Sequence, residues 1–210
     1  MIKPHGADEL NPLFVYDEAK HDALRHEAES LPSLLLTSQA ASNAVMLGAG
    51  YFTPLSGYMN LADTLSVADN MHTTSGLFWP TPVVNLSSDV SGIAGAKRIA
   101  LRDPNMEGNP VIAIQDVTSI EEVSADQLNL IAEKVYRTLD SDHPGTSAFL
   151  AQGNQLISGP IQVLNFSYFQ QDFPDTFRTA VEIRNEIAER GWKTIVAFQT
   201  RNRSEERRVG

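Results

Sequence analysis

The chain has 210 residues and 42% apolar side chains, which is enough to bury a core as one large domain or two small ones. Its formal charge is −10 at pH 7, and its 16 Lys and Arg residues form no basic run before the last eight positions, so nucleic acid is a poor candidate for a partner. No cysteine is present and the five histidines include no i, i+4 pair, which excludes disulfides and thiolate metal sites and leaves no zinc signature. No stretch approaches the roughly 18 apolar residues needed to cross a bilayer, and the first residues lack the apolar region of a signal peptide. We expect a cytoplasmic protein without a membrane segment and without a metal of its own.

The first half of the chain predicts one helix and a mostly β middle. An apolar run leads into a helix that begins at Ser38 and stops at Gly48 or Gly50. Residues Gly50 to Met59 combine glycines, a proline and aromatics, which indicates a rigid turn packed against a core. Three β-branched runs of strand length follow, separated by turn residues: Trp79 to Leu86, Arg98 to Arg102 and Val111 to Val117.

A helix, a turn and a strand close the first predicted domain. Ser124 is followed by Gln127 three residues later, which is the pattern of a capping box, and apolar residues at helical spacing continue the helix to Asp140. Asp142 to Gly145 reads as a turn. Pro160 to Phe166 then alternates between apolar and polar residues, which predicts a strand.

The last part of the chain predicts the beginning of a second domain. The linker from about Ser167 to Pro174 is aromatic rather than Gly- and Ser-rich, so we expect it to be packed. Asp175 is the expected cap of a helix that ends at Gly191. Trp192 to Phe198 is a continuous apolar run, typical of a strand buried in a parallel sheet. Ligands bind beyond the carboxyl ends of such strands, which is where Gln199 to Asn202 falls.

Neither the acidic residues nor the histidines suggest a further site. Asp89, Asp103 and Asp116 fall in different predicted turns and strands without the spacing of metal ligands, so we interpret them as surface acids. His5 and His143 stand beside turn residues, and we assign them structural rather than catalytic roles.

Five segments of the chain form a recognisable series: Ile2 to Gly6, Gly50 to Met59, Phe78 to Pro80, Asp142 to Gly145 and Gly191 to Asn202. In their order and spacing they resemble the ATP sulfurylase (sulfate adenylyltransferase) family. The last segment, a strand that begins with Gly-Trp and ends in Gln-Thr-Arg-Asn, is the most specific of them. The resemblance covers residues 1–202.

The resemblance implies an α+β protein in two parts. Residues 1–168 would form a β-rich, PUA-like N-terminal domain, and residues 169–202 the first helix and strand of a truncated nucleotidyltransferase-type α/β (Rossmann-like) catalytic domain. In such enzymes sulfate attacks the α-phosphorus of MgATP to give adenylyl sulfate and diphosphate, and the reverse reaction makes ATP. The implied substrates are therefore ATP and sulfate, or adenylyl sulfate and diphosphate. Mg²⁺ would arrive with ATP, no cofactor would be bound by this chain itself, and the full-length enzyme would be a homo-oligomer.

The resemblance gives Gln199, Thr200, Arg201 and Asn202 roles in binding sulfate and ATP, and gives the last three catalytic roles as well. Sulfate is a doubly charged anion that must approach a triphosphate, so the site has to supply positive charge and fixed donors rather than a base. Arg201 fits this need because its guanidinium stays protonated and can fork onto sulfate or α-phosphate oxygens. The Gln199 amide can donate a neutral hydrogen bond to sulfate.

After Asn202 the sequence departs from the family, whose members continue with Pro and a His-x-x-His pair. Residues 203–210 are instead a charged tail without histidine. We therefore expect a truncated chain that has little or no sulfurylase activity, because a lone helix and strand cannot form an α/β sheet.

Two other functions stay open, and so does the physiological direction of the reaction. A PUA-like domain could bind RNA, but this would need a basic face, which the charge of −10 disfavours. Residues 1–168 could also be a subunit-contact domain of the full enzyme, which is compatible with the catalytic resemblance.

Overall fold

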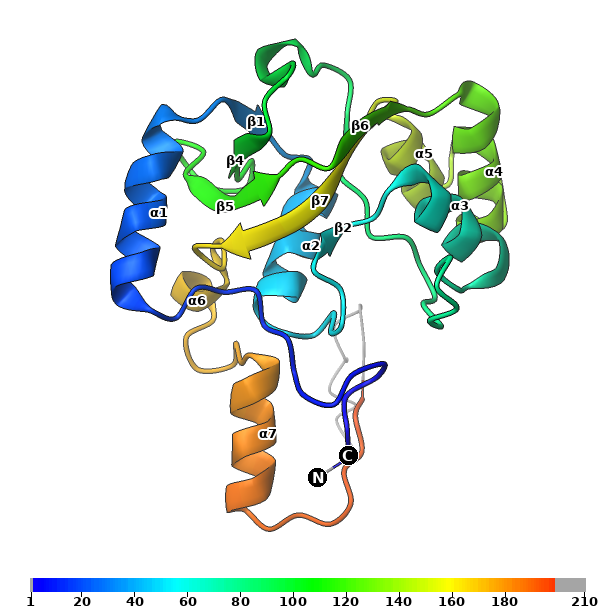
Figure 1. Ribbon diagram of the computed structural model, residues 1–210. Coiled ribbons are helices and arrows are strands. Elements are labelled where there is room, and N and C mark those ends of the chain that lie inside the picture. The colour runs from blue at the N-terminus through cyan, green and yellow to red at the C-terminus, as the bar shows by residue number, and fades with distance from the viewer. Residues whose placement is uncertain (1, 199–210) are drawn as a thin grey trace, which may run out of the picture.

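The computed structural model describes residues 2–198 of the chain. Its helices are α1 (Glu18–Ser30), α2 (Ser38–Gly48), α3 (Leu61–Asn70), α4 (Ala125–Tyr136), α5 (Pro144–Leu150), α6 (Phe169–Asp172) and α7 (Ala180–Glu189), with a 3₁₀ turn η1 (Ser91–Ile93). Its strands are β1 (Ser33–Leu35), β2 (Gly57–Tyr58), β3 (Leu86–Ser87), β4 (Arg98–Arg102), β5 (Val111–Asp116), β6 (Ser119–Glu122) and β7 (Gln155–Val163). The strands form one curled sheet with helices around it (Figure 1).

Strand β7 runs through the middle of the sheet and changes partners halfway along. Its first half pairs antiparallel with β6 and β3, in registers that place Ile157 opposite Ile120 and Leu156 opposite Leu86. Its second half pairs antiparallel with β5 and β2, and the sheet continues from β5 through β4 to β1. One strand therefore joins two halves of the sheet.

Strands β4 and β5 are buried on both faces, which explains their unbroken apolar sequences. Ile99 and Leu101 of β4 face the main core, in which α2 also packs. The intervening Ala100 faces the opposite side together with Ile114 of β5, and there α1 packs through Leu24 and Ala28. Helices α1 and α2 thus cover opposite faces of this half of the sheet.

Small residues let α2 lie close to the sheet. Ala40 and Ala44 are fully buried, and a Cβ at Gly48 would overlap the side chain of Val163 in β7. The Thr37 side chain caps the helix by accepting a hydrogen bond from the amide of Ala40. The buried Tyr58 hydroxyl donates to the Ala40 carbonyl at 2.7 Å, which fastens β2 to the same helix.

Helices α3, α4 and α5 form a separate group on the other half of the sheet (Figure 1, right). They enclose a second core, in which Ile131 and Phe149 meet Leu86 and Leu156 of strands β3 and β7. The capping box predicted for α4 is confirmed, because Ser124 and Gln127 each accept a backbone hydrogen bond from the other.

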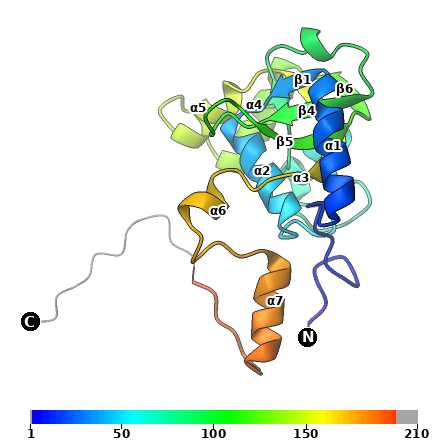
Figure 2. The ribbon, with the colours of Figure 1, turned by 90° about the vertical axis from the view of Figure 1, so that its left-hand side faces the viewer.

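Helix α7 lies apart from the sheet and is attached near its first turn (Figures 1 and 2). The amide of Ala180 donates to the carbonyl of Ala49 at 2.9 Å, and the Tyr51 hydroxyl donates to the carbonyl of Arg178 at 2.7 Å. Farther along the helix, the Arg184 guanidinium donates to the carbonyl of Ile2 at 2.8 Å. Burial, and secondly the nearby Glu182 carboxylate, raise the pKa of Tyr51, so its hydroxyl stays protonated and able to donate at neutral pH.

Several expected elements are confirmed. The helix from Ser38 to Gly48 is α2, and the strands at 98–102 and 111–117 are β4 and β5. The linker is packed only in its first part: it contains α6, and its Phe169 ring lies 5.8 Å from that of Phe177, but residues 170–174 are exposed. Gly191 follows α7 with a φ of 65°, as expected of a residue at a helix C-terminus.

Three expected boundaries are wrong. Within the run 79–86 only Leu86 is in a strand, β3 (Leu86–Ser87), because Pro80 and Pro82 cannot donate to a ladder. Strand β7 begins at Gln155 rather than Pro160. Helix α4 ends at Tyr136, because Arg137 turns into the left-handed region with a φ of 63° and closes the helix four residues early.

The helix that leads to the predicted second domain, and the strand after it, also differ from expectation. Thr179, not Asp175, caps α7, and it forms a capping box with Glu182. Residues 192–198 form no strand: Val196 and Phe198 are 89% and 88% exposed. Apolar sequence alone does not make a strand, which needs a neighbour to accept its hydrogen bonds, and no described strand pairs with this segment.

Gly57→Ala should destabilise the fold, because β2 pairs with β7 so closely at Gly57 that no space is left for a side chain. A Cβ at Gly57 would overlap the carbonyl of Gly159. We expect the free energy of unfolding in urea to fall by about 3 kcal/mol, the upper end for overpacking. Gly92→Ala is the matched control, since nothing lies within 4 Å of a Cβ at that position, and it should stay within about 0.5 kcal/mol of the parent. Equal stability of the two variants would contradict the close approach.

Tyr51→Phe should loosen α7 without unfolding the rest of the chain. Losing the hydrogen bond to Arg178 should cost about 1 kcal/mol, which corresponds to roughly fivefold faster amide hydrogen exchange in α7. Tyr168→Phe is the control, because that hydroxyl makes no hydrogen bond to any residue between 2 and 198. Unchanged exchange in α7 of the Tyr51 variant would show that the bond does not hold the helix.

Candidate functional site

The four residues expected to bind sulfate and ATP, Gln199, Thr200, Arg201 and Asn202, lie outside the described residues, as does the 203–210 tail. The approach to them is described up to Phe198. The Arg190 guanidinium lies 5.0 Å from the centre of the Trp192 ring, a cation–π contact that follows α7 directly. The segment from Trp192 to Phe198 then carries exposed apolar side chains, of which Trp192 and Ile195 are each 52% exposed.

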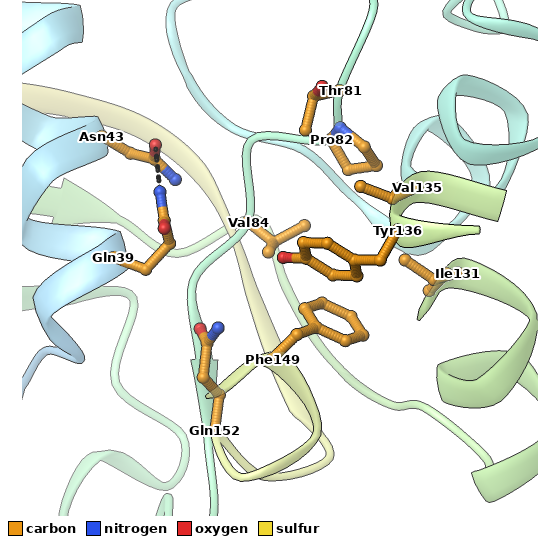
Figure 3. Close-up of a pocket in the computed structure, with 10 residues that line it drawn as sticks. All are labelled: Gln39, Asn43, Thr81, Pro82, Val84, Ile131, Val135, Tyr136, Phe149 and Gln152. Carbon is orange, nitrogen blue, oxygen red and sulfur yellow. Dashed lines mark hydrogen bonds between the residues drawn. The ribbon is translucent and has the colours of Figure 1, made fainter. Parts of the chain in front are cut away.

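A cavity between α2 and α4 is a separate candidate for a functional site (Figure 3). It measures about 300 Å³, and its walls come from α2, α4, α5 and the irregular segment before β3. Its lining residues are Gln39, Asn43, Thr81, Pro82, Val84, Ile131, Val135, Tyr136, Phe149 and Gln152. A floor of aliphatic and aromatic side chains with a few polar groups above it is the usual composition of a small-molecule site.

The polar groups of this cavity converge on its centre (Figure 3). Asn43 is only 7% exposed, and its Oδ1 accepts a long hydrogen bond of 3.4 Å from Gln39 Nε2. On the opposite wall, Gln152 Oε1 accepts from the hydroxyl of Thr37 at 3.2 Å. The Tyr136 ring projects between these amides with its hydroxyl directed into the cavity.

A second cavity of about 540 Å³ adjoins the first and shares Gln39, Tyr136, Phe149 and Gln152 with it. It opens toward the start of α5, where His143 caps the helix by accepting a hydrogen bond from the amide of Thr146 at 3.2 Å. His5 likewise has a structural contact, since its Nε2 lies 2.7 Å from the carbonyl oxygen of Phe78. The structural roles expected for both histidines agree with these contacts.

The first cavity is lined without ionisable groups other than Tyr136. Burial raises the pKa of Tyr136, which keeps its hydroxyl neutral at physiological pH. The cavity therefore offers hydrogen bonds and ring contacts rather than charge, which suits an uncharged ligand.

The acidic residues are arranged differently from the expectation of three surface carboxylates. Asp89 and Asp116 are exposed, but Asp103 is fully buried, so that interpretation was wrong for Asp103. The loop after β4 closes over it: its Oδ1 accepts from the amide of Asn105 at 2.8 Å, and the Asn109 side chain donates to its carbonyl at 2.9 Å. Within residues 2–198, no three His, Asp or Glu side chains gather in an arrangement that could hold a metal ion.

Sequence reasoning missed the cavity although one signal was available. Asn43 follows Ala40 by three residues and precedes Leu47 by four, so it lies on the buried stripe of α2. A polar side chain on such a stripe is informative, because buried polar groups need partners. The opposite wall could not be found in this way, since Tyr136 and Gln152 lie about a hundred residues farther along the chain.

Several curated proteins that are similar in sequence are named sulfate adenylyltransferase. Those of Alcanivorax borkumensis and Allochromatium vinosum are each 65% identical over 202 residues, which is 96% of this chain and 50% and 51% of theirs. That of the Riftia pachyptila sulfur-oxidizing endosymbiont is 58% identical over 202 residues, or 46% of its length. The chain thus spans about half the length of the curated relatives it matches.

Among solved structures, the hexameric APS kinase from Thiobacillus denitrificans superimposes with a TM-score of 0.66 at 27% identity. The match covers 91% of this chain and 32% of that one. No helix within residues 2–198 combines the length and apolarity needed to span a membrane.

The family model of the PUA-like domain matches residues 2–166, which include the whole sheet and helices α1 to α5. The chain belongs to the PUA-like domain family, in the form found in sulfate adenylyltransferases.

Proposed function

We propose that this chain is part of a sulfate adenylyltransferase, in which sulfate attacks the α-phosphorus of ATP to give adenylyl sulfate and diphosphate. The observation that carries the proposal is 65% identity over 202 residues to two proteins with that name. The relatives are about twice as long, so catalysis belongs to the complete protein rather than to these 210 residues alone.

In this proposal the chain has two parts with different tasks. Residues 1–168 form the PUA-like domain, and residues 169–202 begin the catalytic domain of nucleotidyltransferase type. Helix α7 belongs to the second part and is fastened to the first through Ala49, Tyr51 and Ile2. These contacts support a fixed orientation of α7 relative to the PUA-like domain, and α7 precedes the proposed substrate-binding residues in the chain.

Arg201 supplies the main electrostatic stabilisation in the proposed site. Its guanidinium carries the positive charge that two mutually repelling anions need, and its fork suits tetrahedral oxyanions. Gln199 donates to sulfate, while Thr200 and Asn202 contact the nucleotide or the reacting oxygens. Mg²⁺ enters with ATP and offsets part of the triphosphate charge.

We also propose that the complete protein is a cytoplasmic homo-oligomer. The structural neighbour is a hexameric enzyme, and its similarity to this chain supports assembly. A subunit-contact role for residues 1–168 fits the same proposal. The alternative of a non-catalytic binding module draws support only from the PUA-like match over residues 2–166.

A chimera tests the proposed activity. Residues 1–202 of this chain would replace the corresponding 202 residues of the Allochromatium vinosum relative. We expect sulfate-dependent release of diphosphate from ATP at a rate comparable to that of the parent enzyme. In the chimera, Arg201→Ala should lower the rate by about 10²-fold or more, because it removes a group that stabilises the transition-state charge. The 210-residue chain alone should show little or no turnover.

The matched control is Arg25→Ala, which removes an exposed arginine of α1. Substitution of an exposed side chain usually changes stability by no more than about 0.5 kcal/mol, so the rate should be nearly unchanged. Circular dichroism and size exclusion should first establish that each chimera is folded. A folded chimera that neither releases diphosphate from ATP and sulfate nor makes ATP from adenylyl sulfate and diphosphate would rule out the proposed function. Such a result would favour the binding-module alternative.

A further inference from the structure

In the cavity between α2 and α4, one amide side chain has a donor without a partner in the described part of the chain. Asn43 is more than nine-tenths buried, and its Oδ1 is taken by Gln39. Its Nδ2 forms no hydrogen bond with any group in the described part of the chain, and it points into the cavity (Figure 3). This nitrogen is open to the cavity rather than sealed from solvent, so it can donate to a water molecule or to a ligand that enters the cavity.

Three further side chains line the same space with free hydrogen-bonding capacity. Gln152 uses its Oε1 to accept from Thr37, which leaves its Nε2 as a donor. The Tyr136 hydroxyl bonds to no group within residues 2–198 and can both donate and accept. Gln39 donates through Nε2 and so retains Oε1 as an acceptor.

The floor of the cavity fits a flat ring. Val84, Ile131 and Val135 supply an aliphatic surface, and the rings of Tyr136 and Phe149 have their centroids 6.1 Å apart at 51°. Aromatic side chains of this kind stack on heterocyclic bases irrespective of their identity. A volume of about 300 Å³ lies at the lower end of ligand cavities and admits one heterocycle more readily than a nucleotide.

The edge of the ring is specified by the amides. A side-chain amide that presents a donor and an acceptor together is the usual complement of adenine, which offers a ring nitrogen acceptor beside an amino donor. Asn43 Nδ2 and Gln39 Oε1 offer one donor and one acceptor from the same helix, because residues four apart lie on the same face. The absence of an ionised side chain from the lining of this cavity disfavours a phosphate group, which would be buried without a counter-charge.

We propose that this cavity binds a neutral purine base, free or as the base of a nucleoside, with Asn43 and Gln39 on its hydrogen-bonding edge and Tyr136 beside the ring. The proposal does not depend on the adenylyltransferase function, since the site lies within residues 39–152 and its ligand is uncharged. Binding can therefore be measured on the 210-residue chain without any assay of turnover.

The test is a titration of the 210-residue chain with adenine and with adenosine, followed through the methyl signals of Val84, Ile131 and Val135. We expect one saturable site at millimolar concentration or below. Asn43→Leu should weaken binding roughly tenfold and Tyr136→Phe roughly threefold, the effects of losing one hydrogen bond each. Tyr168→Phe removes a hydroxyl of a residue that does not line the cavity, so it should leave the affinity unchanged.

Three results would overturn the proposal. The first is the absence of saturable binding of either compound, and the second is binding that neither Asn43→Leu nor Tyr136→Phe weakens. The third is a response to ATP but not to adenine or adenosine, which would place recognition in the phosphates. The Tyr136 variant keeps the test decisive if Asn43→Leu fails to fold, because removing a hydroxyl that has no protein partner leaves the packing intact.

Discussion

The pairing of β7 with four other strands is the constraint on which the rest of the fold depends. Its first half holds β3 and β6, and its second half holds β2 and β5. The change of partners occurs at Gly159 and Pro160, where a φ of 136° at Gly159 bends the strand. Proline is tolerated at position 160 because it lies where one ladder of hydrogen bonds ends and the next begins. At position 159 only glycine fits, because the carbonyl of Asp116 occupies the space that a Cβ would need.

This bend divides the packed helices into two groups with a seam between them. Helices α1 and α2 pack on the half of the sheet that contains β4 and β5, while α3, α4 and α5 pack around the first half of β7. The cavity of Figure 3 lies along the seam, with Gln39 and Asn43 from one group facing Tyr136 and Phe149 from the other. A cavity at the meeting of two packing units is a common place for a ligand, since neither core fills it completely.

The connection to the proposed catalytic part depends on backbone contacts more than on a large interface. The amide of Ala180, the first residue of α7, donates to the carbonyl of Ala49, and the carbonyl of Arg178 just before the helix accepts from Tyr51, which lies in the turn that the sequence had indicated as rigid. The segment beyond α7 exposes Val196 and Phe198, apolar side chains of the kind that a parallel sheet buries. None of the described strands pairs with this segment.

The sequence by itself determined the elements whose signals are local. Caps and turn residues located α2, the start of α4 and the glycine after α7, and two apolar runs located β4 and β5. The resemblance of short motifs identified the family and the four residues of the proposed site, which the described structure leaves untested.

Only the tertiary structure decided the course of β7 through Gly159 and Pro160, because a glycine and a proline resemble a strand break until the partners on both sides are known. It also decided the presence of α1, a mostly polar helix that buries only Leu24 and Ala28, and the cavity, whose walls are brought together from segments about a hundred residues apart. Local signals reflect the conformational preferences of a few neighbouring residues, whereas strand partners and cavities depend on contacts between residues far apart in the chain.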